Sequence, residues 1–226
     1  MRLRPIIFIV ACALAACTSS PSGSPDVSVQ PSTAQPSAAA SVEPSLAIPS
    51  GWERHEVADY HFALSLPEHW GAVDLTAEDM AGTLEEMYEE FPNASEYREV
   101  IEAGLEQGLA FIALDFDPAH IDEPFITNVN VLGIEGDVLL PVVVAGNVES
   151  IESTFGITPE QESVSLPAGD AVILRWDYPD SHSLAQYYLV EGGMVYVVSF
   201  SRELGEDTRN QEALFEEIMN TFEVLP

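Results

Sequence analysis

A pair of adjacent glycines, Gly192 and Gly193, constrains the fold more than any other feature of this sequence. The residues on either side, 184–191 and 194–201, are rich in β-branched and aromatic side chains, which favour strands. Glycine tolerates the positive φ angles that a two-residue hairpin turn requires at both positions. The sequence therefore predicts two long antiparallel strands joined by this turn.

Alternation of apolar and polar residues predicts further strands. Tyr60, Phe62, Leu64 and Leu66 would lie on one face of a strand, which forms a hairpin with residues 52–57. The same criteria predict strands over residues 109–116 and 126–134, and a third that begins at Val164 or Ala171 and ends at Tyr178.

Helical spacing of apolar side chains predicts helices over residues 76–91, 93–108 and 208–222, and a segment over 141–155 that ends in a helix. Thr76-x-x-Asp79 resembles a capping box, Asn147 is placed to cap the third helix, and Gly156 is placed to end it. Several strands are apolar on both faces, so helices should cover both faces of a largely antiparallel sheet. We therefore expect an α+β fold, an α/β/α sandwich.

The composition is strongly acidic, with 38 Asp and Glu residues against 7 basic residues, all of them arginine. Removal of a signal peptide would take away Arg2 and Arg4 and leave a formal charge of 5 − 38 = −33. This charge argues against a nucleic-acid partner, because phosphate binding needs clustered cations. The acidic surface could bind a basic partner or divalent cations, but its spread along the whole domain favours a general adaptation of surface charge.

The N-terminus has the zones of a signal peptide. Arg2 and Arg4 precede an apolar run over residues 6–14, which is too short to span a bilayer as a helix. The motif that follows, Leu14-Ala15-Ala16-Cys17, resembles the lipobox of bacterial lipoproteins. This resemblance implies that Cys17 is lipidated and becomes the first residue of the mature chain. The anchor would hold the protein on the extracytoplasmic side of the cell membrane or the outer membrane.

Three segments follow from these features. Residues 1–16 are the signal peptide, and residues 17–50 are the lipidated cysteine with a tether rich in Ser, Pro and Ala. The tether cannot bury enough apolar surface to fold, and as a flexible coil it spans roughly 30 Å. Residues 51–226 form one globular domain without a thiol, since the other cysteine, Cys12, leaves with the signal peptide.

The densest set of side chains that could ligate a metal is Asp115, Asp117, His120, Asp122 and Glu123, of which the first four are the candidates. Oxygen ligands suit Ca²⁺, and a histidine among them suits Zn²⁺ or Mn²⁺. The spacing is not that of an EF-hand, and among 38 acidic residues such a cluster is expected by chance. We therefore predict no metal site and no cofactor.

Asp180-Ser181-His182 contains the residue types of a hydrolytic triad. Neighbours in sequence rarely converge in space as a triad must, and the chain has no Gly-x-Ser-x-Gly elbow. We interpret this segment as a polar turn between strands.

Asn128 and Asn130 point to one face of a predicted strand whose other face carries Val129 and Val131. Polar side chains inside a covered sheet need hydrogen-bond partners. The two asparagines could form the floor of a ligand pocket under a helix layer, with Trp176 as an aromatic wall. Alternatively, they could bond to neighbouring loops and stabilise the fold. The sequence leaves both interpretations open.

Four segments, in order, resemble PsbP-like domains. Residues 60–70 are similar to the opening strand followed by proline and tryptophan, and residues 125–131 to the Asn-Val-Asn-Val strand. Residues 184–200 resemble the closing hairpin, and residues 218–222 the terminal segment. The LpqN-type lipoproteins of actinobacteria are similar in this fold and in their anchor. The resemblance implies an antiparallel sheet between helices, and adaptor, assembly or small-ligand roles without catalysis.

The sequence therefore favours a membrane-anchored extracytoplasmic lipoprotein that is not an enzyme and whose domain binds an envelope protein or a small ligand. Two alternatives stay open. One is a metal-dependent or other envelope enzyme, and the other is a surface-structural protein whose acidic coat is its main property.

Overall fold

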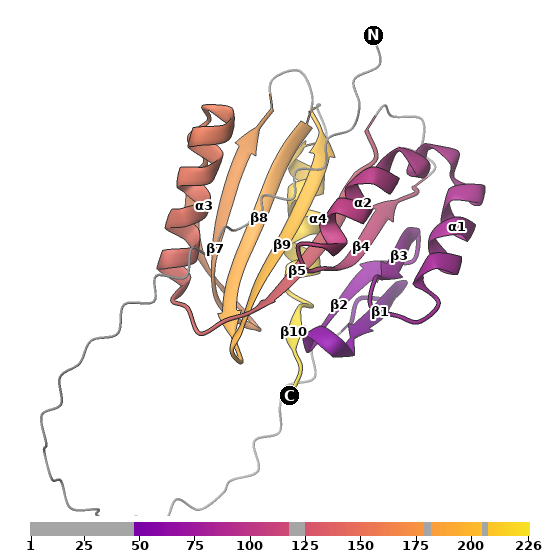
Figure 1. Ribbon diagram of the computed structural model, residues 1–226, viewed down its shortest axis with the longest axis horizontal. Helices are drawn as coiled ribbons and strands as arrows, with labels where there is room; N and C mark the ends of the chain where they lie inside the picture. The colour runs from indigo at the N-terminus through magenta and orange to yellow at the C-terminus, as the bar shows by residue number, and fades with distance from the viewer. Residues whose placement is uncertain (1–47, 118–124, 179–181, 205–207) are drawn as a thin grey trace, which may run out of the picture.

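The computed structural model describes residues 48–117, 125–178, 182–204 and 208–226. Its largest element is a seven-stranded sheet (Figure 1) in which neighbouring strands are antiparallel. The strand order is β3-β4-β5-β9-β8-β7-β6. These strands are β3 Trp70–Asp74, β4 Leu109–Asp115, β5 Asn128–Glu135, β6 Glu160–Leu166, β7 Gly169–Asp177, β8 His182–Glu191 and β9 Met194–Glu203.

A smaller sheet has the strand order β1-β2-β10. β1 (Trp52–Val57) and β2 (Phe62–Pro67) form the predicted antiparallel hairpin around the 3-10 turn η1 (Ala58–Tyr60). The short β10 (Glu223–Val224) pairs with the other side of β2. The hairpin therefore belongs to a second sheet, whereas the sequence led us to expect a single sheet.

The helices are α1 Met80–Glu90, α2 Arg98–Leu105, α3 Leu140–Phe155 and α4 Thr208–Met219, and the 3-10 helix η2 Pro92–Tyr97 precedes α2. α1 begins later than predicted, because Thr76 folds back onto Asp74. The backbone N–H and the hydroxyl of Thr76 donate to Asp74 Oδ1 at 2.8 and 2.6 Å. This turn takes the place of the expected capping box.

Two glycines have the conformations that the sequence requires. Gly192 and Gly193 have φ angles of 61° and 82°, which confirms the two-residue hairpin turn between β8 and β9. Gly156 has φ 67° at the end of α3, as expected of a helix terminator. Asn147 is not a cap, because it lies inside α3, where its side-chain amide donates to the Val143 carbonyl at 2.9 Å.

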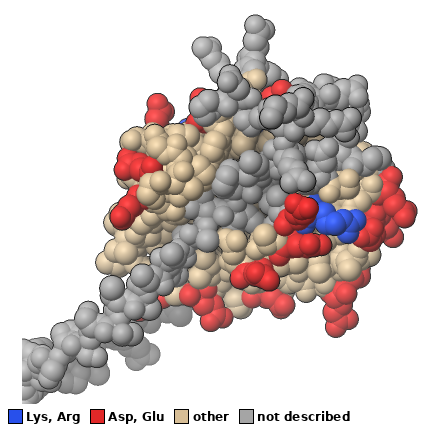
Figure 2. Space-filling view, turned by 45° about the horizontal axis from the view of Figure 1, so that its top comes forward, with Lys and Arg blue, Asp and Glu red and all other residues tan. Residues whose placement is uncertain are grey.

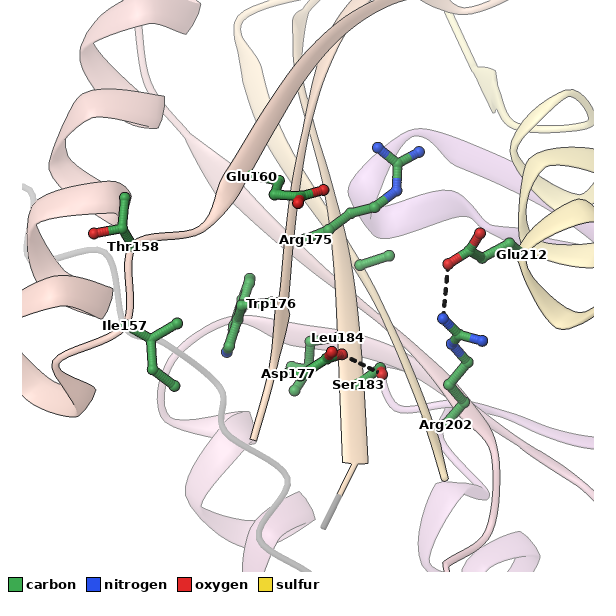
Figure 3. A pocket seen from close by; sticks show the side chains of 11 residues that line it. Ile157, Thr158, Glu160, Arg175, Trp176, Asp177, Ser183, Leu184, Arg202 and Glu212 are labelled. Atoms are coloured by element: carbon green, nitrogen blue, oxygen red, sulfur yellow. Dashed lines mark hydrogen bonds and ion pairs between the residues drawn. The ribbon is translucent and has the colours of Figure 1, made fainter. Parts of the chain in front are cut away.

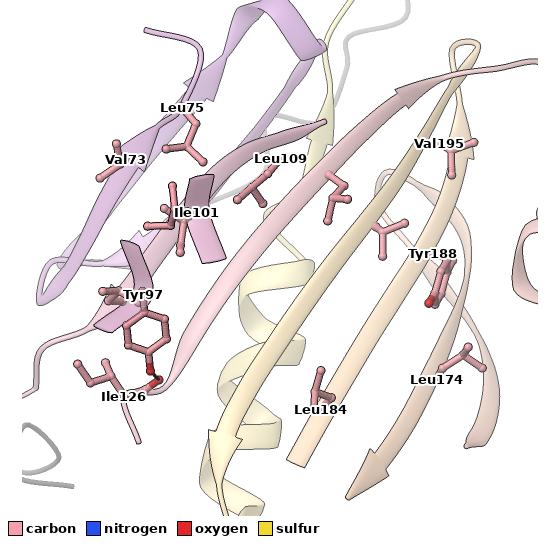
Figure 4. Close-up of a cluster of buried hydrophobic side chains, with 14 of the residues drawn as sticks. Val73, Leu75, Tyr97, Ile101, Leu109, Ile126, Leu174, Leu184, Tyr188 and Val195 are labelled. Atoms are coloured by element: carbon pink, nitrogen blue, oxygen red, sulfur yellow. Dashed lines mark hydrogen bonds between the residues drawn. The ribbon is translucent and has the colours of Figure 1, made fainter. Parts of the chain in front are cut away.

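The two faces of the main sheet belong to two apolar clusters. We call the face under α1, α2 and α3 the helical face, and Figure 4 shows part of its cluster. We call the opposite face the α4 face, because its side chains pack with those of α4 and of the small sheet. The small sheet therefore covers part of the α4 face, where the sequence led us to expect helices alone. None of the helices in the described ranges is both long and apolar enough to cross a bilayer.

Two strands of the main sheet were not predicted as strands. Trp70, which follows the predicted strand and Pro67, begins β3 and pairs with Asp115 of β4. β6 is an edge strand with mostly exposed side chains, among them Glu160, Gln161 and Glu162. An edge strand that buries little surface has no strong apolar alternation, so its sequence resembles that of a loop.

Gly133 lies where the small sheet meets the main sheet. A Cβ atom at this position of β5 would overlap the ring of Tyr60 in η1. The Tyr60 carbonyl also accepts a hydrogen bond from the Tyr196 hydroxyl of β9 at 3.0 Å. The missing side chain of Gly133 therefore lets the two sheets pack closely.

We predict that Gly133→Ala lowers the free energy of unfolding by about 1–3 kcal/mol, because the added methyl group must displace the Tyr60 ring. Urea denaturation of residues 17–226 carrying Cys17→Ala measures this change. Gly146→Ala in α3 is the control, since nothing lies within 4 Å of its added Cβ. That helical substitution should raise stability by up to about 1 kcal/mol. A loss of the same size in both variants would contradict the contact with Tyr60.

Candidate ligand-binding site

A group of polar side chains lies inside the helical face of the main sheet. Register places Asn130 of β5 beside Ser199 of β9, and Ser199 beside Gln186 of β8. Asn128 and Ser201 form the next register pair on the same face, two residues further along each strand. All five side chains are at most 2% exposed. We call these five residues the polar row.

Hydrogen bonds satisfy part of the polar row. The Gln186 side-chain amide donates to the Ser199 hydroxyl at 2.9 Å and accepts from the Tyr188 hydroxyl at 2.5 Å. Asn128 Nδ2 donates to the Ile126 carbonyl at 3.0 Å. That carbonyl also accepts from the Tyr97 hydroxyl at 3.1 Å, which ties the segment before β5 to the end of η2 (Figure 4).

Two oxygen atoms of the polar row are left without a donor. Among the described residues, no group donates to Oδ1 of Asn128 or to Oδ1 of Asn130. A buried acceptor without a partner costs about 1–3 kcal/mol, and interiors usually avoid it. The helical face therefore contains two acceptors that a bound N–H or O–H group would satisfy.

Trp176 lies on the same face but away from the asparagines. Its row across the sheet runs from Asn128 through Ser201 and Leu184 to Trp176. Because strands are about 4.8 Å apart, Asn128 and Trp176 are separated by roughly 14 Å. The structure thus puts the three candidate residues on one face without bringing them to one point.

Trp176 lines a cavity of about 320 Å³ near the edge of the sheet. We call it the edge cavity. Figure 3 shows Ile157, Thr158 and Trp176 on one side of it, and Arg202 with Glu212 on the other. The remaining lining residues are Glu160, Arg175, Asp177, Ser183, Leu184 and Ala185. Its volume is at the lower end of the range for small-ligand sites.

An aromatic cluster at one end of the helical face was missed by the sequence analysis. His182 begins β8, is 3% exposed and stacks on Phe125 at 4.9 Å between ring centroids. Tyr178 contacts His182 at 4.8 Å and Phe155 at 5.2 Å. The interpretation of His182 as part of a polar turn is therefore wrong, while Asp180 and Ser181 lie outside the described residues.

Burial controls the protonation of this cluster. Removal from water lowers the pKa of His182 to about 4, because the charged imidazolium is poorly solvated there. Burial also raises the pKa of Tyr178, while the nearby Trp176 side chain acts in the opposite direction. Near neutral pH, His182 is therefore an uncharged member of the aromatic cluster.

The metal-ligand candidates are described only in part. Asp115 is buried, and its Oδ1 accepts from the backbone N–H of Asp117 at 2.9 Å and lies 3.3 Å from His69 Nε2. His120 and Asp122 lie outside the described residues. Within the described part of the chain, no three His, Cys, Asp or Glu side chains are grouped as a metal site.

The surface charge is distributed as the composition suggests. Acidic side chains are spread over the face seen in Figure 2, and basic side chains are few. Four arginines pair with glutamates at 2.6–3.0 Å: Arg54 with Glu56 and Glu223, Arg98 with Glu85, Arg175 with Glu162, and Arg202 with Glu212. These pairs neutralise the cations and leave most carboxylates facing solvent.

No protein-family model matches the sequence. No curated protein sequence matches it either. Comparison with known proteins therefore rests on structure.

Solved structures similar to this chain include a PsbP protein of Synechocystis sp. PCC 6803, named CyanoP. It has 11% identity and a TM-score of 0.47 over 83% of this chain and 98% of that one. LpqN of Mycobacterium tuberculosis, described as involved in cell envelope biogenesis, has 12% identity and a TM-score of 0.42 over 73% and 83% of the two chains. The Ran-binding protein Mog1p of Saccharomyces cerevisiae has 11% identity and a TM-score of 0.45 over 77% and 95%. The resemblance to PsbP-like and LpqN-type proteins that the sequence motifs indicated is found again here.

We predict that His182 makes the fold less stable in acid. Its pKa is about 4 in the folded state and about 6.5 in the unfolded chain, so protonation favours unfolding. This contribution is fully present above pH 6.5 and is lost as the pH falls from 6.5 to 4, at a cost on the order of 3 kcal/mol. Urea denaturation at several pH values measures it.

His182→Phe is the matched variant, because it keeps a ring against Phe125 and removes the titrating group. Its stability should fall less steeply between pH 6.5 and 4. An unchanged slope would assign the effect to other groups, such as His55, whose pKa is also lowered by burial.

Proposed function

We propose that this chain is an extracytoplasmic lipoprotein whose domain binds a small ligand without catalysing a reaction. Cys17 carries the anchor, residues 18–50 are the tether, and residues 51–226 are the binding domain. The resemblance of Leu14-Ala15-Ala16-Cys17 to a lipobox supports the anchor. The polar row supports the binding role.

One observation carries the proposal: among the described residues, no group donates to the side-chain oxygens of Asn128 and Asn130, which are buried in the polar row of the helical face. If the polar row served only the fold, apolar residues in its place would be as stable or more stable. A bound ligand that donates hydrogen bonds to these oxygens would explain why the interior keeps acceptors that have no partner in the protein. The ligand would bring N–H or O–H donors to these oxygens.

The surroundings of the polar row define the rest of the ligand. Leu132, Leu174, Leu184 and Val197 are apolar residues of the same face. A ligand between the sheet and the helices would therefore combine a donor group with an apolar body. Hydroxylated or amide-containing amphiphiles have this chemistry.

The side chains of the polar row suit binding better than catalysis. Amides do not titrate near neutral pH, so Asn128, Asn130 and Gln186 cannot act as general acids or bases. Ser199 accepts its hydrogen bond from the Gln186 amide, which is not a base that could activate the hydroxyl as a nucleophile. The row can hold and orient a ligand but offers no activated group.

We predict that Asn130→Val keeps or raises the free energy of unfolding, because it removes a buried acceptor without a partner. Asn128→Val is the comparison and should lower stability by about 1 kcal/mol, because it breaks the bond to the Ile126 carbonyl. Urea denaturation measures both changes.

The Asn130→Val variant also tests binding. Native mass spectrometry of the protein purified from its own membranes should show a small molecule that copurifies with the unmodified protein and is lost from Asn130→Val. The proposal would be contradicted if Asn130→Val were less stable than the unmodified protein and no small molecule copurified with the unmodified protein. The polar row would then be structural.

We predict that Cys17→Ala moves the protein from the membrane fraction to the soluble extracytoplasmic fraction, because two or three acyl chains are what hold a lipoprotein in place. Cell fractionation and labelling with a palmitate analogue measure the change. Cys12→Ala is the control and should leave both the membrane fraction and the label unchanged. Retention of Cys17→Ala in the membrane would contradict the lipid anchor.

A further inference from the structure

The edge cavity lies beside the exposed edge of β6, on the α4 face of the main sheet. Glu160, the first residue of β6, lines the cavity and pairs in register with Arg175 of β7. Glu212 closes the other side from α4 (Figure 3). The cavity and the edge strand therefore form one continuous surface, which is separate from the polar row.

The charges of this surface leave carboxylates available. Arg175 is held by Glu162 at 2.6 Å, and Arg202 by Glu212 at 2.7 Å. Among the described residues, no arginine forms a salt bridge with Glu160 or Asp177. The Asp177 carboxylate accepts a hydrogen bond from the Ser183 hydroxyl at 2.5 Å. Each cavity arginine is thus paired with a glutamate, although Nη1 of Arg202 is buried and has no hydrogen-bond partner among the described residues. The carboxylates of Glu160 and Asp177 remain to bind a positive charge.

The outer edge of β6 offers backbone hydrogen bonds as well. β6 is the last strand in the sheet order, and within the described residues no strand pairs with its outer side. Alternate residues of this seven-residue strand direct unpaired N–H and C=O groups outward, where an incoming extended chain could bond to them. A second copy of this protein is a poor occupant, because two β6 edges would bring Glu160 and Glu162 against like charges.

We propose that β6 and the edge cavity dock an extended, basic segment of a partner protein. The segment adds as an eighth strand beside β6 and places a lysine or arginine side chain between Glu160 and Asp177. Side chains on one face of a strand repeat every two residues, so alternate basic residues of the segment also face Glu162. The charge of the mature chain draws such a segment in, and backbone pairing fixes its register.

The test uses the mature chain, residues 17–226 with Cys17→Ala, and a labelled eight-residue peptide of alternating lysine and threonine. Fluorescence anisotropy at 0.15 M salt gives the dissociation constant. The double variant Glu160→Gln, Asp177→Asn should bind the peptide about tenfold more weakly, because both free carboxylates are lost. The control Glu99→Gln, Glu102→Gln changes exposed residues of α2 by the same net charge and should alter affinity less than about threefold.

Hydrogen exchange tests the strand addition separately. The β6 amides should exchange more slowly when the peptide is bound, and a peptide N-methylated along the edge that faces β6 should lose binding. If both double variants weakened peptide binding equally, the peptide would be attracted by the overall charge of the protein, and the proposal would be overturned. Binding without protection of β6 would overturn the docking geometry, and so would equal binding of a peptide with glutamate in place of lysine.

Discussion

The pairing of β5 with β9 is the contact on which the main sheet depends. Strands β3, β4 and β5 come from the first part of the chain, and β6 to β9 come from the second. In the sheet order, these two groups are joined only between β5 and β9. This long ladder connects residues that are far apart in sequence, so neither group completes the sheet without the other.

The polar row lies across this same joint. Asn128 and Asn130 belong to β5, and their register partners Ser201 and Ser199 belong to β9. The helical face is thus least apolar where the two groups of strands meet. A ligand that donates to the two asparagine oxygens of β5 would also lie beside Ser199 and Ser201 of β9. It would therefore bind the assembled sheet in preference to either group alone.

Much of the fold follows from local sequence, and the exceptions have physical causes. Gly192 and Gly193 fix their hairpin because their φ angles suit few other residues. β6 and β10 were not predicted, since one is a polar edge and the other has only two residues. Asn128 and Asn130 were correctly placed on one buried face, but their separation from Trp176 depends on the strand order. The burial of His182 depends on Phe125, a contact that no local pattern reveals.

The small sheet determines how the domain responds to mechanical load. If residues 18–50 act as the proposed tether, tension would reach β1 first, and its partner β2 leads through Pro67 towards β3 of the main sheet. Trp52 lies at the open end of the β1–β2 hairpin, so tension would break the pairs one after another instead of shearing them together. In the proposed lipoprotein, β1 would therefore peel away under tension and lengthen the reach of the anchor while the seven-stranded sheet stays folded.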